Sequence, residues 1–207
     1  VLMFSWIGLG IALVMHLRGR SLLIAETERL VEATGNDAVA ALSIRLREIS
    51  ALTRTLAATT EELPPSEASY QSMIPAMLDF NGDEGVAGGG IWPEPYEFDA
   101  TQERRSFFWG RDEQGTLQYF DDYNQTGPGY HHEPWYVVAR HLAPGTCAWS
   151  ESYMDPYSFE PMVTCTVATG TGESLTGAAT VDLKLGSLNQ WVSQWETVTG
   201  GYGVIVD

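Results

Sequence analysis

Acidic and aromatic side chains are concentrated in the stretch from Trp135 to Asp182, and their types suit the binding of a cation. A carboxylate attracts an ammonium group, and a desolvated cation over an aromatic ring gains about 0.5–2 kcal/mol. The pattern therefore favours an amine ligand, such as a biogenic amine, a polyamine or a quaternary ammonium compound. The residues that we expect to bind it are Trp109, Glu133, Trp135, Tyr136, Trp149, Tyr153, Asp155 and Asp182.

Some of these residues also have a purely structural interpretation. Trp135 and Trp149 can be ordinary core residues, and Asp155 can be a turn residue before Pro156. Asp182 is harder to explain by structure alone, because it lies in an apolar strand-like run and a buried acid needs a partner. Both interpretations stay open at the level of the sequence.

No sequence pattern argues for catalysis, a metal or a cofactor. His131 and His132 precede Glu133 without an HExxH motif or a third ligand, and Ser150 and Ser152 lack a nucleophile elbow. The run Gly88–Gly90 is not followed by the Lys and Ser or Thr of a phosphate loop. We expect these glycines to let a strand pass close to another backbone.

The charge of the chain excludes one class of partner. The formal net charge is −16, from 27 acids and 11 basic residues among 207. Such a field repels nucleic acid, and no basic stripe is present. At 44% hydrophobic residues the chain can bury a core.

The two cysteines, Cys147 and Cys165, each lie in a strand-like run with a turn-rich segment between them. In an oxidising compartment we predict one disulfide, which closes a loop of about 20 residues and is worth about 3 kcal/mol. The alternative is two buried free thiols. A metal site is not indicated, because no CxxC or suitably spaced His accompanies them.

The N-terminal residues 1–15 carry no charge, and His16, Arg18 and Arg20 follow. As a helix they cover about 22 Å, less than the roughly 30 Å hydrocarbon core of a bilayer. Because the chain starts inside this run and stops inside a strand-like run, we expect it to be part of a longer protein. We predict a retained, truncated membrane anchor over residues 1–20; a signal peptide and a buried core helix are the alternatives.

Residues 21–63 have a helical pattern that contains a heptad seam. The seam consists of Val39, Leu42, Leu46, Ile49, Thr53 and Leu56. It predicts a stalk helix that pairs with a second copy of the chain as a homodimer. An amphipathic helix packed on its own domain is the compatible alternative. The prolines at 64 and 65 end the helix.

The rest of the chain alternates between strand and turn signals. We predict strands at 86–92, 106–111, 117–123, 148–153, 161–168 and 176–183, and helices at 67–80, 132–141 and 185–198. A hairpin turn is expected at 112–115. This order predicts an α+β fold, in which a long N-terminal helix precedes an antiparallel sheet.

The ordered segments GGGIWPEP, RSFFWGRD, YFDDYN, EPWY, CAWSESYMDPYSFEPMVTCTVA, LTGAATVDLKLGSL and GGYGVIVD resemble the double Cache (dCache) extracytoplasmic sensor domain of bacterial transmembrane receptors. The resemblance implies two PAS-like lobes on a long N-terminal helix, with the ligand in the membrane-distal lobe. It implies a distal lobe over residues 64–198 and the start of a proximal lobe at 199–207.

The resemblance also assigns ligand-binding residues. The Trp-Tyr pair of the amino-acid-binding members matches Trp135 and Tyr136, their Tyr-x-Asp matches Tyr153 and Asp155, and their later Asp matches Asp182. Their carboxylate-binding Arg is replaced by Glu133. A Glu repels a carboxylate, so this departure again favours an amine over an ordinary amino acid.

These observations predict a ligand sensor in the inner (plasma) membrane of a bacterium, with the sensing domain periplasmic or extracellular. By resemblance its output is a diguanylate cyclase, a histidine kinase or a chemotaxis transducer, and this part of the chain is not an enzyme. The alternatives are a membrane-anchored extracytoplasmic enzyme, such as a hydrolase, and a dimerising structural module.

Overall fold

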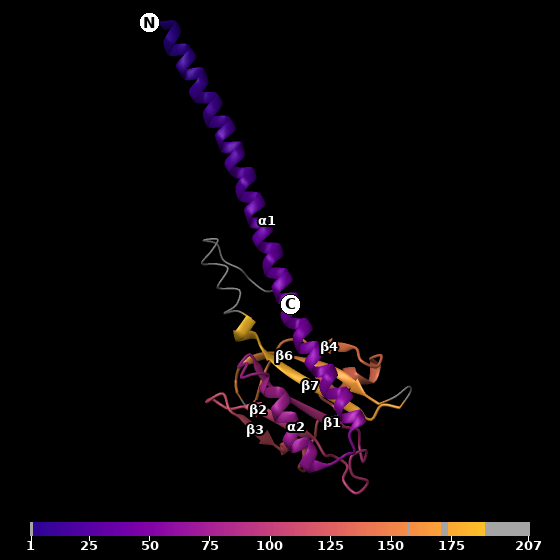
Figure 1. Cartoon of the computed structure of the whole chain (residues 1–207). Helices are drawn as coiled ribbons and strands as arrows, with labels where there is room; N and C mark the ends of the chain where they lie inside the picture. Colours follow the sequence, from indigo (N-terminus) through magenta and orange to yellow (C-terminus); the bar gives the residue numbers. More distant parts are fainter. Residues whose placement is uncertain (1, 157, 171–173, 189–207) are drawn as a thin grey trace. The chain divides into compact units, whose positions relative to one another are not determined.

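The computed structural model describes residues 2–156, 158–170 and 174–188 (Figure 1). The chain divides within its first helix: residues up to Ser43 belong to one compact unit, and the described residues from Ile44 to 188 belong to another. The helix predicted over 185–198 is described only at residues 185–188, which are helical. The start of the second lobe predicted at 199–207 lies outside the described residues.

Helix α1 runs without interruption from Leu2 to Glu62, and it ends before the two prolines as predicted. Leu22, Leu23 and Val39 on it are exposed. Within the described part of the chain, no helix is both long enough and apolar enough to cross a membrane.

The C-terminal part of α1 packs on its own domain. Ile49, Thr53 and Leu56 are completely buried, and Tyr70 of α2 donates a hydrogen bond to the Thr60 carbonyl oxygen at 3.3 Å. From Ile49 onward, the predicted pairing seam is therefore occupied inside the domain and is not available to a second helix.

The domain is built on a seven-stranded antiparallel sheet, which confirms the predicted α+β fold. The strand order is β3-β2-β1-β7-β6-β4, and β5 pairs with β6. The strands are β1 (Val86–Pro93), β2 (Phe107–Arg111), β3 (Leu117–Phe120), β4 (Cys147–Trp149), β5 (Tyr153–Met154), β6 (Pro161–Thr169) and β7 (Gly177–Lys184).

Two predicted strands are shorter than expected. The strand expected at 117–123 ends at Phe120 and is followed by the 3₁₀ helix η1 (Asp122–Asn124). The strand expected at 148–153 is split into β4 and β5. The reason lies at Ser150, whose hydroxyl accepts a hydrogen bond from the Thr164 N–H at 2.9 Å. A side chain here takes the place of a main-chain carbonyl in the ladder, which interrupts the regular pairing.

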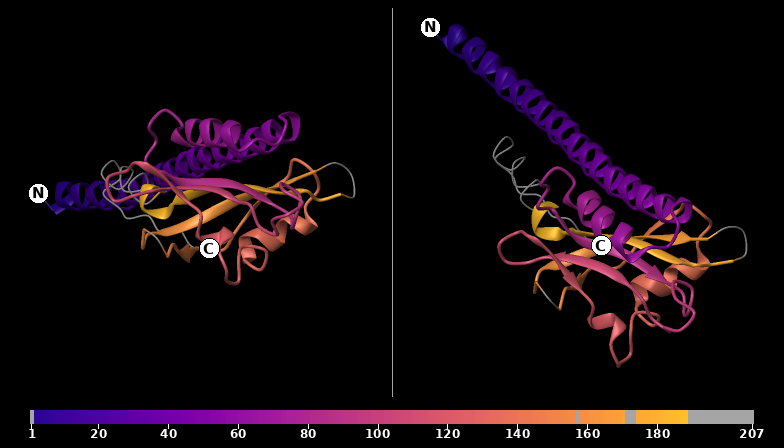
Figure 2. Two further views of the ribbon diagram at one scale, coloured as in Figure 1. Left: turned by 90° about the horizontal axis from the view of Figure 1, so that it is seen from below. Right: turned by 60° about the horizontal axis from the view of Figure 1, so that its bottom comes forward.

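Different elements cover the two faces of the sheet. Helix α2 (Glu67–Asp79), capped by Ser66, lies beside the end of α1 on one face, as both views in Figure 2 show. The segment with α3 (Pro134–Val137) and the 3₁₀ helix η2 (Val138–His141) packs on β6 at the other face. We call these the helix face and the loop face.

Glycines allow the central strands to approach closely. A Cβ atom added to Gly88, Gly89 or Gly90 would collide with the backbone of β2 or β7. The expectation that this run permits close backbone approach is therefore confirmed. Gly88 and Gly90 also stand opposite Asp182 and Thr180 of β7 and present no side chain on that face.

Candidate ligand-binding site

The loop face contains a small cavity of about 30 Å³ that combines carboxylates with aromatic rings. We call it the acid–aromatic pocket. Its walls come from β1, β2, β5 and β7, from η1 and α3, and from the residues that follow β5. The lining residues are Trp92, Phe108, Tyr123, Trp135, Tyr153, Asp155, Pro156, Thr180 and Asp182.

Asp182 is the buried acid of this pocket, with 6% of its surface exposed. Its carboxylate accepts a hydrogen bond of 2.7 Å from the Thr164 hydroxyl. Burial raises the pKa of Asp182 to about 6; the Thr164 hydrogen bond lowers this pKa, and the charge of Asp155 raises it further. Among the described residues, no Lys or Arg forms an ion pair with this carboxylate, so its charge is balanced only by hydrogen bonding.

A chain of hydroxyl groups leads to this carboxylate. The Tyr153 hydroxyl lies 2.8 Å from Thr164 Oγ1, which in turn lies 2.7 Å from Asp182 Oδ1. Since Thr164 has one hydroxyl proton and gives it to the carboxylate, Tyr153 donates to Thr164. Burial also raises the pKa of Tyr153, so this donor keeps its proton at neutral pH.

Asp155 has two roles in the structure. Its carboxylate accepts hydrogen bonds of 2.7 Å from both the main-chain N–H and the hydroxyl of Ser158, three residues further along the chain. The turn interpretation is therefore right, but the same residue also lines the pocket. The two carboxylates repel each other, and a bound cation would relieve that repulsion.

Aromatic rings form the walls around the two acids. The ring centroid of Trp92 lies 4.6 Å from Trp135 and 5.3 Å from both Phe108 and Tyr123. The Trp92 indole N–H donates to the Thr180 hydroxyl at 2.8 Å, which fixes the orientation of the ring. Ring faces beside carboxylates make this pocket suitable for a cation.

The structure thus brings four of the predicted site residues together, namely Trp135, Tyr153, Asp155 and Asp182. Trp109 does not line this pocket. Trp109 lies two residues after Phe107 in β2, and Phe107 packs on Tyr70 of α2 with ring centroids 5.0 Å apart. Because side chains alternate along a strand, Trp109 belongs to the helix face.

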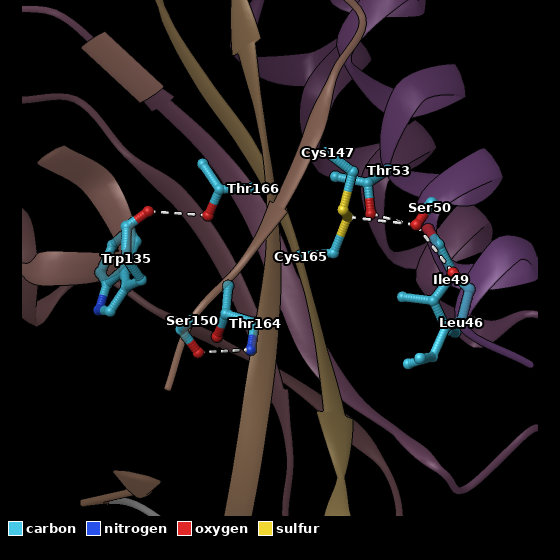
Figure 3. Close-up of a disulfide and its surroundings, with 10 residues drawn as sticks. All are labelled: Leu46, Ile49, Ser50, Thr53, Trp135, Cys147, Ser150, Thr164, Cys165 and Thr166. Atoms are coloured by element: carbon cyan, nitrogen blue, oxygen red, sulfur yellow. Dashed lines mark hydrogen bonds between the residues drawn. A yellow bond between two sulfur atoms is a disulfide. The ribbon is translucent and has the colours of Figure 1, made fainter. Parts of the chain in front are cut away.

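Trp149 is also on the helix face. It pairs with Cys165, whose Sγ lies 4.0 Å from the Ser50 hydroxyl of α1. Figure 3 shows Cys165 directed toward α1, while Thr164 and Thr166 point to the side of Trp135. Paired residues in an antiparallel sheet project to the same face, so Trp149 cannot reach the pocket.

The other two predicted residues lie close in sequence to Trp135 but do not line the pocket. Tyr136 is completely buried in the aromatic core, and its hydroxyl donates to the Glu94 carboxylate at 2.6 Å. Glu133 caps the start of α3, where its main-chain carbonyl accepts from the N–H groups of residues 136 and 137. The proposed repulsion of a carboxylate by Glu133 therefore does not act by direct contact.

Sequence reasoning missed five pocket residues, which are Trp92, Phe108, Tyr123, Pro156 and Thr180. The side chains of Trp92 in β1 and Phe108 in β2 both lie on the loop face. Alternation along each strand could have identified them as pocket residues once the sheet register was known. Tyr123 lies in a 3₁₀ helix that was predicted as strand.

The two cysteines predicted as a disulfide are joined, with an S–S distance of 2.04 Å (Figure 3). The bond ties the edge strand β4 to β6 on the helix face. Among the described residues, no group of three or more His, Cys, Asp or Glu is arranged to hold a metal ion.

Residues 70–190 match the family described as methyl-accepting chemotaxis protein-like, first PDC sensor domain. This segment is more than half of the chain and contains the whole acid–aromatic pocket. No curated protein matches the sequence.

Solved structures share the fold at low sequence identity. The extracellular domain of mmHK1S-Z2, described as a histidine kinase, has a TM-score of 0.65 and 21% identity; the match covers 80% of this chain and 63% of that one. The extracellular domain of mmHK1S-Z3 has a TM-score of 0.61 and 16% identity, and the match covers 74% of this chain and 57% of that one. The sensory domain of the Campylobacter jejuni chemoreceptor Tlp3 with isoleucine bound has a TM-score of 0.57 and 13% identity, with coverages of 82% and 64%. This chain therefore spans less than two thirds of the length of each.

Proposed function

Because the chain belongs to the family of methyl-accepting chemotaxis protein-like first PDC sensor domains, we propose that it senses a small cationic amine outside the cytoplasm as the ligand-binding part of a membrane receptor. One observation carries the ligand class. Asp182 is a buried carboxylate enclosed by aromatic rings, without a cationic partner among the described residues.

The charge of the pocket favours a cation over a zwitterion or an anion. Its lining combines Asp155 and Asp182 with ring faces, and none of the residues described there is Lys, Arg or His. A carboxylate ligand would be repelled by both acids and would find no bidentate partner. The isoleucine bound to Tlp3 therefore does not transfer directly to this pocket.

The volume limits how the ligand enters. About 30 Å³ is roughly a tenth of the smallest typical ligand pocket of about 300 Å³. An ammonium headgroup fits beside Asp182, but a larger substituent requires the turn at Asp155–Ser158 to move outward. This turn is held by the two Ser158 hydrogen bonds to Asp155, which exchange for ligand contacts when a cation binds.

The receptor context rests on the family and on the sequence. We propose residues 1–20 as a membrane anchor, residues 21–63 as a stalk, and a distal ligand-binding lobe from residue 64. The pairing of two chains would use the outward face of α1, because residues 49–56 of the predicted seam are buried in the domain. A chemotaxis transducer or a histidine kinase is the proposed output.

Calorimetric titration of the purified protein tests the ligand class. The panel contains tetramethylammonium, putrescine and histamine as cations, and isoleucine and succinate as carboxylate controls. We expect binding of at least one cation, loss of that binding in Asp182→Asn, and no change in Glu113→Gln. Glu113 is an exposed acid in the β2–β3 turn, so this control removes the same charge outside the pocket. Binding of carboxylates alone, or unchanged amine affinity in Asp182→Asn, would overturn the proposal.

A further inference from the structure

A second and larger hollow, of about 280 Å³, lies on the helix face where α1 ends. We call it the α1-end cleft. Its walls are the last turn of α1, the start of α2, the end of β1, the loop after β1 and the facing ends of β6 and β7. Its volume approaches the lower limit of typical small-molecule sites, about 300 Å³.

One wall of this cleft is aromatic and rigid. The ring centroids of Tyr70 and Phe98 lie 5.6 Å apart. The ring centroid of Phe107 lies 5.0 Å from that of Tyr70 and 4.8 Å from that of Phe98. Phe107 is completely buried, so it fixes the other two rings from behind. Ile91 of β1 adds an aliphatic surface.

The polar groups of the cleft are hydroxyls and carboxylates. Glu61 of α1 accepts a hydrogen bond of 2.7 Å from the Gly170 N–H, whereas Glu97 is exposed at the rim. None of the residues described at the walls is basic. The nearby Arg105 stacks on Phe107 at 4.7 Å and is paired with Glu67 at 2.9 Å, so its charge is already neutralised.

We infer that the α1-end cleft is a second binding site, which takes a small amphiphilic amine. The apolar part of this ligand packs on Tyr70 and Phe98, and its ammonium group lies at the Glu97 carboxylate. This inference is independent of the amine proposed for the acid–aromatic pocket, because the two hollows share no lining residue and open on opposite faces of the sheet.

The position of the cleft gives this ligand a direct contact with α1. Thr60, Glu61 and Leu63 are part of the wall, and the Tyr70 hydroxyl bonds the Thr60 carbonyl oxygen at 3.3 Å. By contrast, no described residue of α1 lines the acid–aromatic pocket. A ligand in the cleft therefore contacts the last turn of α1 directly. Its effect on this helix does not have to be transmitted through the sheet.

The test uses 2-phenylethylamine as the probe and Asp182→Asn as the background, so that the acid–aromatic pocket is disabled. We expect calorimetric binding to persist in this background. Glu97→Gln should weaken it by about two- to five-fold, as for a partly exposed ion pair. Phe98→Ala should weaken it at least ten-fold. Glu103→Gln, an exposed acid of the same loop that does not line the cleft, should leave affinity unchanged.

Two results would overturn this inference. The first is loss of all 2-phenylethylamine binding in Asp182→Asn, which assigns the probe to the acid–aromatic pocket and leaves the proposed function intact. The second is unchanged affinity in both Glu97→Gln and Phe98→Ala. Because Glu97 is exposed, Glu97→Gln should fold normally. This variant therefore still tests the inference if Phe98→Ala does not fold.

Discussion

The buried carboxylate of Asp182 should reduce the stability of the unbound protein more at neutral pH than in mild acid. Burial raises its pKa from the ordinary 3.8 to about 6. The folded state therefore holds this proton at pH values where the unfolded chain has released it. Protonation of Asp182 therefore stabilises the folded state. This stabilisation is fully present below about pH 4 and is lost as the pH rises through about 6. The difference between a pKa of 3.8 and one of about 6 corresponds to about 3 kcal/mol.

The substitution Asp182→Asn removes the charge but keeps an oxygen that can accept from Thr164. We expect the variant to match the wild type near pH 4 and to be up to about 3 kcal/mol more stable at pH 7.5. Urea denaturation of both proteins between pH 4 and 8 measures this difference. The subtraction cancels the titration of the other acids.

A second substitution checks the cause of this effect. Thr164→Val removes the hydrogen bond that favours the charged form of Asp182, so the pH-dependent loss should extend to higher pH. A variant Asp182→Asn that is less stable than wild type at every pH would refute the reasoning, because it would mean that the carboxylate is already neutralised in the folded protein.

Three further variants, one of them a double substitution, test the elements that hold the domain together. Replacing both Cys147 and Cys165 by Ser removes a disulfide between residues 18 positions apart in the sequence. The free energy of unfolding, measured in urea under oxidising conditions, should fall by about 3 kcal/mol. Equal stability of the variant and the wild type would contradict this. Arg111→Met removes a buried guanidinium that donates to carbonyl oxygens of β1, the β2–β3 turn and α2, and should cost about 3–5 kcal/mol; a loss below about 1 kcal/mol would argue against it. Gly90→Ala forces a Cβ into the backbone of β2 and should prevent folding as judged by circular dichroism, whereas Gly35→Ala in α1, with open space around it, should be tolerated.

Local signals in the sequence predicted most elements of the fold, because the contacts that stabilise them are also local. The turn at 112–115 is an example: the Asp112 carboxylate accepts from the N–H groups of Gln114 and Thr116 at 3.0 and 2.9 Å. The break between β4 and β5 could not be predicted in this way. It depends on Ser150 meeting Thr164 across the sheet, and this pairing is set by register, not by the residues around Ser150.

The same limit explains the errors in the candidate site. Composition identified a region rich in acids and aromatic residues, but it did not say which face of the sheet each side chain occupies. Trp149 and Thr164 illustrate the difference, because the residue that pairs with Trp149 is Cys165, one position beyond Thr164. One step along a strand moves a side chain to the opposite face, so Trp149 lies on the helix face, whereas Thr164 lies on the loop face and donates to Asp182.

This alternation also determines how the acid–aromatic pocket can influence α1. On β6, Thr164 bonds the Asp182 carboxylate on the loop face, and the next residue, Cys165, contacts Ser50 of α1 on the helix face (Figure 3). No described residue of α1 lines the pocket itself. The effect of a ligand at Asp182 on α1 must therefore be transmitted through the sheet. β6 therefore has contacts on both sides of the sheet, and the disulfide to Cys147 limits its movement relative to β4. A shift of β6 caused by a ligand at Asp182 would therefore displace Cys165 against α1 at Ser50, one helical turn before the fully buried Thr53.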